Sequence, residues 1–373
     1  MKFSPIRFQG SLASAGVALM PFLYLQFSYP HGKGFIHLSD VVLVDIPLLD
    51  SFILWSLIGI MLVFTLLHLG LTLVFVKDLI IWLLNKEQVK SFLNAEMTNI
   101  GIFSPILSLS MTMNIILAPL SFFSPSLASM QQAMMPYAFL FWALLWSALL
   151  LLEAKVVKVW LTIPMEIDKL NFTWLLDSFA FGMVALVGSG IASTAQNQSL
   201  SNISAFMTWM VFFMGLLLLA IKVMVLILNQ LKAHTLPEKT FLPATLSIVP
   251  IICLYGVSSF KLNTYLTNTF NYNMEMFSYL AIISSYVIAT GYFLFCIYLI
   301  KDYFLREFIK HEFYPSQWGI VCALVGFEVL GAYVFGFYYK SNILLGANYI
   351  ATLLAVVIYG IIFIRYLRAS KAK

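Results

Sequence analysis

The chain has 373 residues, of which 61% are hydrophobic and only 10% are charged. Soluble domains carry roughly 25% charged residues, so this composition excludes a soluble globular protein. It also excludes a disordered one, because disorder needs the opposite bias. The formal net charge of +5 matters less than the placement of the bases, which sets the orientation of a membrane protein.

Ten stretches of the chain are apolar and long enough to cross a membrane as helices, which takes about 20 residues each. They are residues 8–28, 52–76, 99–121, 136–156, 174–194, 205–231, 240–260, 277–300, 316–338 and 344–364. Little chain is left between them. We therefore predict an all-α protein with one transmembrane domain over residues 1–373 and no soluble domain.

Lysine and arginine residues predict the orientation of these helices. With the N-terminus in the cytoplasm, 17 of the 21 bases fall on the cytoplasmic side, against Lys33, Lys261 and Lys340 outside. Because cytoplasmic loops carry the excess of bases, we expect both termini in the cytoplasm. The expected location is a bacterial inner membrane.

Odd-numbered and even-numbered spans differ in composition. The odd spans are richer in Gly, Ala, Ser and Thr, and they hold the prolines well inside spans, which are Pro21, Pro105, Pro119, Pro243 and Pro250. Small residues allow close approach, and a proline frees a carbonyl that protein or water must satisfy. This alternation predicts five helical hairpins in quasi-five-fold arrangement, with odd helices lining a central pore and even helices outside. The alternative is that small residues only mark tight helix packing.

Four segments give the chain a family resemblance. They are the first span over 8–16, the run 103–110 at the third, the Pro243 to Pro250 stretch of the seventh, and the entry to the ninth over 313–318. These segments resemble the tellurite-resistance/dicarboxylate transporter family, which includes plant slow anion channels and yeast malate and sulfite carriers and belongs to the voltage-dependent anion channel superfamily.

The resemblance implies a homotrimer in which each subunit has its own anion pore. It also implies a gate, because the family closes its pore with a phenylalanine followed by proline in the ninth helix. Here that position falls on Cys322 or Ala323, and the proline is absent. Phe327, about one turn further, is the nearest candidate plug.

Charged residues inside spans are expensive in a bilayer and are therefore functional candidates. Glu328 sits near the middle of the ninth span. It is either a proton-coupling or anion-repelling gate group beside Phe327, or a protonated acid bonded to a freed carbonyl. Lys222, in the sixth span, either snorkels to the interface, pairs with a buried acid or attracts an anion. Asp177 is either a carboxylate favoured by its helix N-terminus or a charge at the pore mouth.

Hydroxyl groups and helix backbone are the expected contacts for a weakly held anion. Ser104, Ser108 and Thr112 are spaced by four and share one helix face, although such hydroxyls also bond back to the preceding turn. The candidate pore-lining contacts are Gly10, Ser104, Ser108, Thr112, Gly188 and Ser247.

Motifs for catalysis and cofactors are missing from the sequence. No P-loop, GxSxG, HExxH or CxxC occurs, and His68 is a lone histidine in the second span, for which a structural role is favoured. We therefore expect no enzyme activity, metal, cofactor or nucleic acid partner.

The leading hypothesis is a channel or transporter for C4-dicarboxylate, sulfite or tellurite-like anions. The alternative is the membrane anchor subunit of a quinol oxidoreductase.

Overall fold

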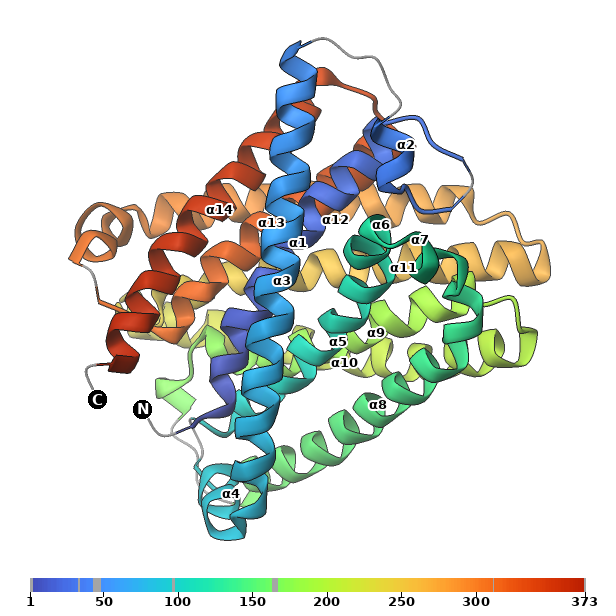
Figure 1. Ribbon diagram of the computed structural model, residues 1–373. Helices are drawn as coiled ribbons and strands as arrows, with labels where there is room; N and C mark the ends of the chain where they lie inside the picture. The colour runs from blue at the N-terminus through green and yellow to red at the C-terminus, as the bar shows by residue number, and fades with distance from the viewer. Residues whose placement is uncertain are drawn as a thin grey trace.

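The computed structural model describes residues 3–32, 34–42, 48–95, 98–162, 167–310 and 312–371 (Figure 1). The described residues form helices and connections, with no strand. In the described part of the chain, ten helical segments are long and apolar enough to cross a membrane, as predicted. Lys33, one of the three bases predicted outside, falls beyond the described residues.

The odd-numbered spans supply five helices, which we call the inner helices. They are α1 (Phe8–Ser28), α5 (Ser104–Ile115), α9 (Leu176–Thr194), α11 (Ile248–Phe270) and α13 (Trp318–Phe337). A short 3₁₀ turn precedes each one. These turns are η1 (Pro5–Arg7), η2 (Asn99–Phe103), η5 (Phe172–Leu175), η6 (Leu242–Ser247) and η9 (Pro315–Gln317).

The even-numbered spans supply the outer helices. They are α3 (Leu48–Leu84), α8 (Gln131–Thr162), α10 (Gln198–Ala233), α12 (Glu275–Leu299) and α14 (Asn342–Lys371). The shorter connecting helices are α2 (Leu38–Val42), α4 (Lys86–Leu93), α6 (Ser121–Phe123) and α7 (Pro125–Ser129), with η3 (Ile116–Leu120), η4 (Ile167–Lys169), η7 (Tyr303–Glu307) and η8 (Phe308–Lys310).

Burial separates the two sets of helices. In the most hydropathic stretch of each span, 72–94% of residues are buried in the inner set and 17–39% in the outer set. The exposed residues of the outer set are large and apolar, for example Leu73, Leu144 and Leu217. A helix that exposes such a surface is suited to lipid rather than water. The compositional difference between odd and even spans therefore corresponds to a difference in burial.

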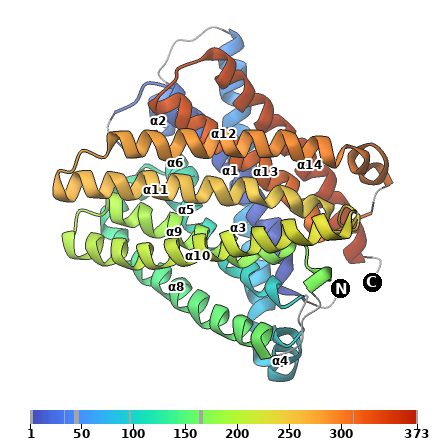
Figure 2. The ribbon, with the colours of Figure 1, turned by 180° about the vertical axis from the view of Figure 1, so that it is seen from behind.

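The inner helices contact one another in a closed cycle. Each packs against two others, in the order α1, α5, α9, α11, α13 and back to α1. The outer helices cover this cycle from several directions (Figures 1 and 2), with α3 on α1, α10 on α9, α12 on α11 and α14 on α13. Helix α8 differs, since it contacts α9 more extensively than its own sequence partner α5.

Glycines of α13 allow a close crossing with the segment that leads into α11. A Cβ added at Gly319 would lie 2.9 Å from Pro243 O, and one at Gly326 would lie 2.9 Å from Pro250 Cα. Gly319 and Gly326 are seven residues apart in the sequence, and so are Pro243 and Pro250. The backbones of these segments can touch only because no side chain stands between them.

The third span bends where its proline interrupts the helix. Pro119 lies in η3, a π-helical turn, and Ser121 Oγ donates a hydrogen bond to Ile116 O at 3.0 Å beside it. Proline kinks free backbone carbonyls, and a nearby hydroxyl satisfies one of them here. This interruption explains why the span divides into α5, η3 and α6.

Several helices extend beyond their predicted ends. Outer helices α3, α8 and α10 contain 37, 32 and 36 residues, which at about 1.5 Å per residue makes each longer than a hydrocarbon core of about 30 Å. Inner helix α11 runs to Phe270 rather than to residue 260. Lys261 is consequently part of a buried helix and not of a connecting loop.

Candidate functional site

Two cavities lie inside the cycle of inner helices. The first, of about 210 Å³, is lined by residues of all five inner spans toward their C-terminal ends, and we call it the C-side cavity. The second, of about 290 Å³, is lined by the 3₁₀ turns and first residues of the same spans, and we call it the N-side cavity. Because both involve the same five spans, they lie one after the other along the inner helices.

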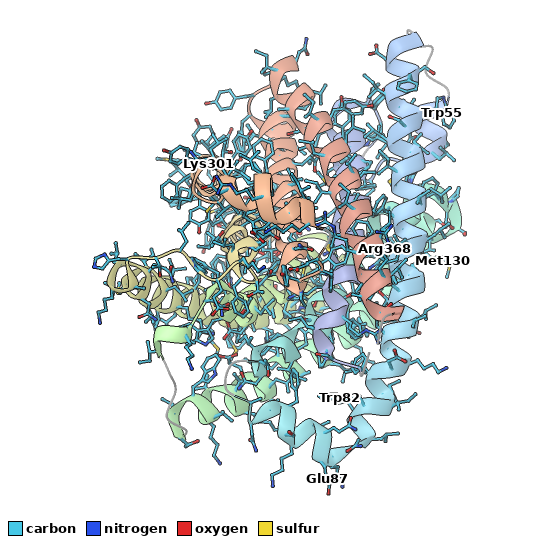
Figure 3. The ribbon with its side chains drawn as sticks, turned by 90° about the vertical axis from the view of Figure 1, so that its left-hand side faces the viewer. Trp55, Trp82, Glu87, Met130, Lys301 and Arg368 are labelled. Atoms are coloured by element: carbon cyan, nitrogen blue, oxygen red, sulfur yellow. The ribbon has the colours of Figure 1, made fainter. Side chains whose placement is uncertain are left out.

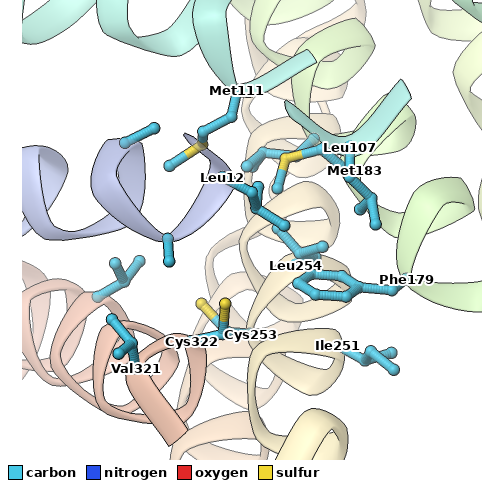
Figure 4. Close-up of a cluster of buried hydrophobic side chains, with 14 of the residues drawn as sticks. Leu12, Leu107, Met111, Phe179, Met183, Ile251, Cys253, Leu254, Val321 and Cys322 are labelled. Atoms are coloured by element: carbon cyan, nitrogen blue, oxygen red, sulfur yellow. The ribbon is translucent and has the colours of Figure 1, made fainter. Parts of the chain in front are cut away.

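Three residues line both cavities and therefore form the boundary between them. They are Leu12 of α1, Phe179 of α9 and Cys322 of α13. Their exposed fractions are 4%, 6% and 8%. Figure 4 shows the Phe179 ring pointing into a cluster with Leu254 and Leu12, with Cys322 across from it. This apolar layer interrupts the space along the inner helices.

Most of the surface of the N-side cavity is apolar, but polar groups from several segments also reach it. Its walls include hydroxyl and amide side chains from separate segments, namely Ser4, Gln9, Thr98, Thr173, Thr240, Ser247 and Ser316. The N-terminal ends of all five inner spans also face this region, since each 3₁₀ turn contributes at least one lining residue. Helix N-termini carry partial positive charge and free N–H groups, so this cavity suits an anion without a full opposite charge.

The C-side cavity is mostly apolar, with one charged residue among the described residues that line it. That residue is Lys261 of α11, whose ammonium lies so near Gly190 that a Cβ added there would come within 3.4 Å of it. Within the described part of the chain, Lys261 has no ion pair. Sequence reasoning placed it in an outside loop, because the charge ended the apolar stretch at residue 260.

Two of the predicted site residues line a cavity. Cys322 borders both cavities, and Ser247 borders the N-side cavity. Ala323, the other candidate for the family's gate position, is fully buried and borders neither. The ninth helix therefore presents the thiol of Cys322 to the central space.

Phe327, the predicted plug, lies elsewhere. Its ring packs against Tyr286 and Phe293 of outer helix α12, with ring centroids 5.6 and 6.2 Å apart. It borders neither cavity. Phe327 is five residues beyond Cys322, about 1.4 turns of an α-helix, so its side chain points to the outer face of α13. Sequence reasoning also missed Phe179. The gate phenylalanine was expected in the ninth span, whereas Phe179 lies in helix α9, which is the fifth span.

Glu328 is fully buried, and neither carboxyl oxygen has a hydrogen-bond partner in the described part of the chain. It lines neither cavity. An ionised carboxylate in such surroundings costs several kcal/mol. The structure therefore shows neither of the roles predicted for Glu328. Among the described residues no carbonyl accepts a hydrogen bond from its carboxyl group, and the side chain lines neither cavity.

The two predicted glycines contact neighbouring helices rather than open space. A Cβ added at Gly10 would lie 3.2 Å from the Trp318 ring, and one at Gly188 would lie 2.3 Å from the Trp142 ring. Thr208 Oγ1 is equally close to Gly188, at 2.2 Å from that Cβ position. At these two positions the small residue marks tight helix packing, the alternative that the sequence left open.

The predicted hydroxyl face of the third span points away from the cavities. Ser104 and Ser108 are fully buried, and within the described residues their hydroxyls have no partner. Thr112 Oγ1 lies 2.9 Å from His68 Nε2 of α3, and His68 Nδ1 lies 2.8 Å from Ser11 O. These contacts join α1, α3 and α5, and they confirm a structural role for His68.

Lys222 and Asp177 form a buried ion pair between α10 and α9. Lys222 Nζ also donates to Trp174 O at 3.0 Å and lies 4.2 and 4.6 Å from the ring centroids of Trp160 and Trp174. Glu153 of α8 is buried nearby, without a partner for its oxygens in the described residues. Lys222 thus pairs with a buried acid, one of its sequence-based alternatives, and does not snorkel.

A small ion-pair network lies outside the spans, at the end of the molecule that holds the N-side cavity. Lys310 Nζ is 2.7 Å from Glu307 Oε1, and Lys239 Nζ is 3.5 Å from Glu307 Oε2. The hydrogen bond from Lys310, together with the charge of both lysines, lowers the pKa of Glu307. The network ties the connection before α11 to the one before α13.

Comparison with known proteins gives one family. The family model described as voltage-dependent anion channel matches residues 2–367. A search of curated proteins found no match. The family match covers the first nine spans, most of the tenth and every residue of the two cavities.

Proposed function

This chain belongs to the voltage-dependent anion channel family, and from that premise we propose that it carries small inorganic anions or organic acids along the axis of its inner helices. It is an integral membrane protein of a family of anion channels and transporters. C4-dicarboxylate, sulfite and tellurite-like anions are the substrate classes to test.

The observation that carries the proposal is that two cavities follow one another along the same five inner helices. All five inner spans contribute to both, and three shared residues separate them. Lys261 supplies a positive charge on one side, and five helix N-termini supply partial charge on the other. Hydroxyls and backbone N–H groups bind anions weakly enough to release them, which conduction requires.

We place the constriction at the layer of Leu12, Phe179 and Cys322. A narrow apolar layer excludes water and ions, so a pathway that contains one is closed until its side chains move. Phe179 is the largest of the three residues. Rotation of its ring out of the layer would join the two cavities.

The experiment compares Phe179→Ala with Phe327→Ala in reconstituted liposomes. Anion efflux with chloride, nitrate, sulfite, malate and succinate is measured for each variant and for the unmodified chain. We expect Phe179→Ala to raise efflux of at least one anion, because it removes the largest side chain of the layer. We expect Phe327→Ala to leave efflux unchanged, because its ring packs on α12.

The reverse pattern would restore Phe327 as the constriction, as the sequence predicted, and would remove Phe179. No anion efflux from any of the three proteins, each shown to be folded and inserted, would contradict the proposed function.

Other parts of the prediction rest on the sequence and its resemblance. Cytoplasmic termini, a bacterial inner membrane and a homotrimer all stay predictions. Proton coupling through Glu328 stays one as well, and because Glu328 lines neither cavity, such coupling would act through a shift of α13. The quinol oxidoreductase anchor gains no support from the family match.

A further inference from the structure

Helix α4 separates the N-side cavity from a third, lysine-rich cavity on the outside of the bundle. This outer cavity, of about 460 Å³, lies between the end of α3, α4 and the end of α8. Four lysines line it: Lys86, Lys90, Lys155 and Lys158. We call it the lysine pocket. Phe92 of the same short helix lines the N-side cavity, so the two cavities share α4 as a wall.

The charge of the lysine pocket is not neutralised within the described part of the chain. All four lysines are exposed, and none takes part in an ion pair there. The acid on α4 itself, Glu87, is in the first turn of the helix, and it lies at the edge of the molecule and points away from it (Figure 3). Four like charges around one hollow attract an anion, which would relieve their mutual repulsion.

Apolar surface borders the lysine pocket. Leu83 and Val159 are among its lining residues. Next to them, Leu84 and Leu161 have exposed fractions of 79% and 81%. Since α3 and α8 are both longer than the hydrocarbon core, their ends reach the headgroup layer. A ligand of this hollow can therefore place a phosphate among the lysines and hydrocarbon along the two helix ends.

We propose that the lysine pocket binds the headgroup of an anionic glycerophospholipid from the leaflet on the side of the chain termini. The charge complementarity selects an anion, and the flanking leucines select one that carries acyl chains. Basic pockets at the ends of transmembrane helices bind anionic headgroups by the same combination. The inference does not depend on the anion pathway, because it concerns only the outer face of α3, α4 and α8.

The test measures lipid retention by the full-length protein in mixed micelles. The protein is mixed with dioleoyl phosphatidylglycerol or dioleoyl phosphatidylcholine at equal mole fraction, and retained lipid is counted by native mass spectrometry. We expect preferential retention of phosphatidylglycerol. Lys155→Gln/Lys158→Gln should weaken it roughly 30-fold, because each base near an anionic lipid contributes on the order of fivefold.

The matched control is Lys232→Gln/Lys301→Gln, which removes the same charge from the exposed ends of α10 and α12. It should retain phosphatidylglycerol like the unmodified protein. A second variant, Lys86→Gln/Lys90→Gln, changes the α4 wall and should reproduce the loss if the first variant does not fold. Size-exclusion profiles report folding for all three.

Three results would overturn the proposal. The first is equal retention of the two lipids by the unmodified protein, and the second is equal loss in the control and pocket variants. The third is displacement of phosphatidylglycerol by millimolar inorganic phosphate alone, which would identify a free-phosphate site without an acyl contribution. Loss confined to the pocket variants and insensitive to phosphate supports a phospholipid site, whatever the variants do to anion efflux.

Discussion

Lys222 illustrates how a charged side chain is accommodated deep in an apolar bundle. The ammonium has an opposite charge in Asp177, a carbonyl acceptor in Trp174 and two aromatic faces around it. Removing one partner of such a buried pair costs about 3–5 kcal/mol, because the other charge is left uncompensated. This pair therefore fixes α10 against α9 at the level where α9 carries Phe179 two residues further on.

Lys261 is also a charged residue inside the bundle, but unlike Lys222 it has no ion-pair partner among the described residues. We predict that Lys261→Gln lowers anion efflux on the order of tenfold at low ionic strength, because one charge lining a low-dielectric cavity concentrates counter-ions. The reduction should shrink in high salt, which screens the charge. Efflux of nitrate from liposomes at two salt concentrations checks both statements.

The control for this charge is Lys340→Gln. Lys340 is exposed between α13 and α14 and lines neither cavity. The Lys340→Gln variant should leave anion efflux unchanged. If the two variants behave alike, Lys261 does not act on the permeating anion.

At the scale of elements, glycines decide how near two helices come. Gly319 and Gly326 bring α13 against Pro243 and Pro250, and Gly16 does the same for α1 against Val325, 2.9 Å from an added Cβ. The inner cycle is tight because these positions lack side chains.

We predict that Gly326→Ala lowers the stability of the folded protein by about 1–3 kcal/mol, the usual cost of overpacking. The added methyl would stand 2.9 Å from Pro250 Cα, and backbone cannot move aside as a flexible side chain can. Thermal stability in detergent, followed by size-exclusion chromatography after heating, measures the effect.

Gly360→Ala is the matched control, because an added Cβ on α14 at that position meets nothing within 4 Å. It should be neutral or slightly stabilising, since alanine is the better helix former. Equal destabilisation by both variants would show that the α11–α13 crossing is not the cause.

At the scale of the whole molecule, both ends of the chain lie on one side. Arg7 Nε donates to Tyr366 Oη at 3.1 Å, and Figures 1 and 2 show the termini close together. An even number of spans between them accounts for this arrangement. The N-side cavity and the lysine pocket lie at that same end.

We predict that this end faces the cytoplasm. A fluorescent protein fused after the C-terminus in a bacterial host should fluoresce, and alkaline phosphatase fused there should be inactive. Alkaline phosphatase inserted between Thr194 and Gln198, at the opposite end of the molecule, should be active. Active enzyme at the C-terminus would invert the assigned orientation.

The sequence alone determined the class and the layers of this protein. The class and the layers follow from the composition of each segment taken by itself. That composition sets the ten apolar stretches, the placement of bases and the alternation of small residues, and it decides how a segment interacts with lipid. The prediction of ten spans is confirmed, and so is the family suggested by the segments from Phe8 to Trp318. The helix ends were less accurate, because apolar windows stop at the first charge, as at Lys261.

The tertiary structure decided which side chains meet at the centre. Periodicity places Ser108, Gly188 and Phe327 on inner helices but does not tell which face of each helix turns inward, because both faces are apolar in a fully buried helix. That face depends on the contacts of all five helices at once. Phe179 and Cys322 reach the boundary between the cavities through those contacts, while Gly188 and Phe327 are turned toward outer helices.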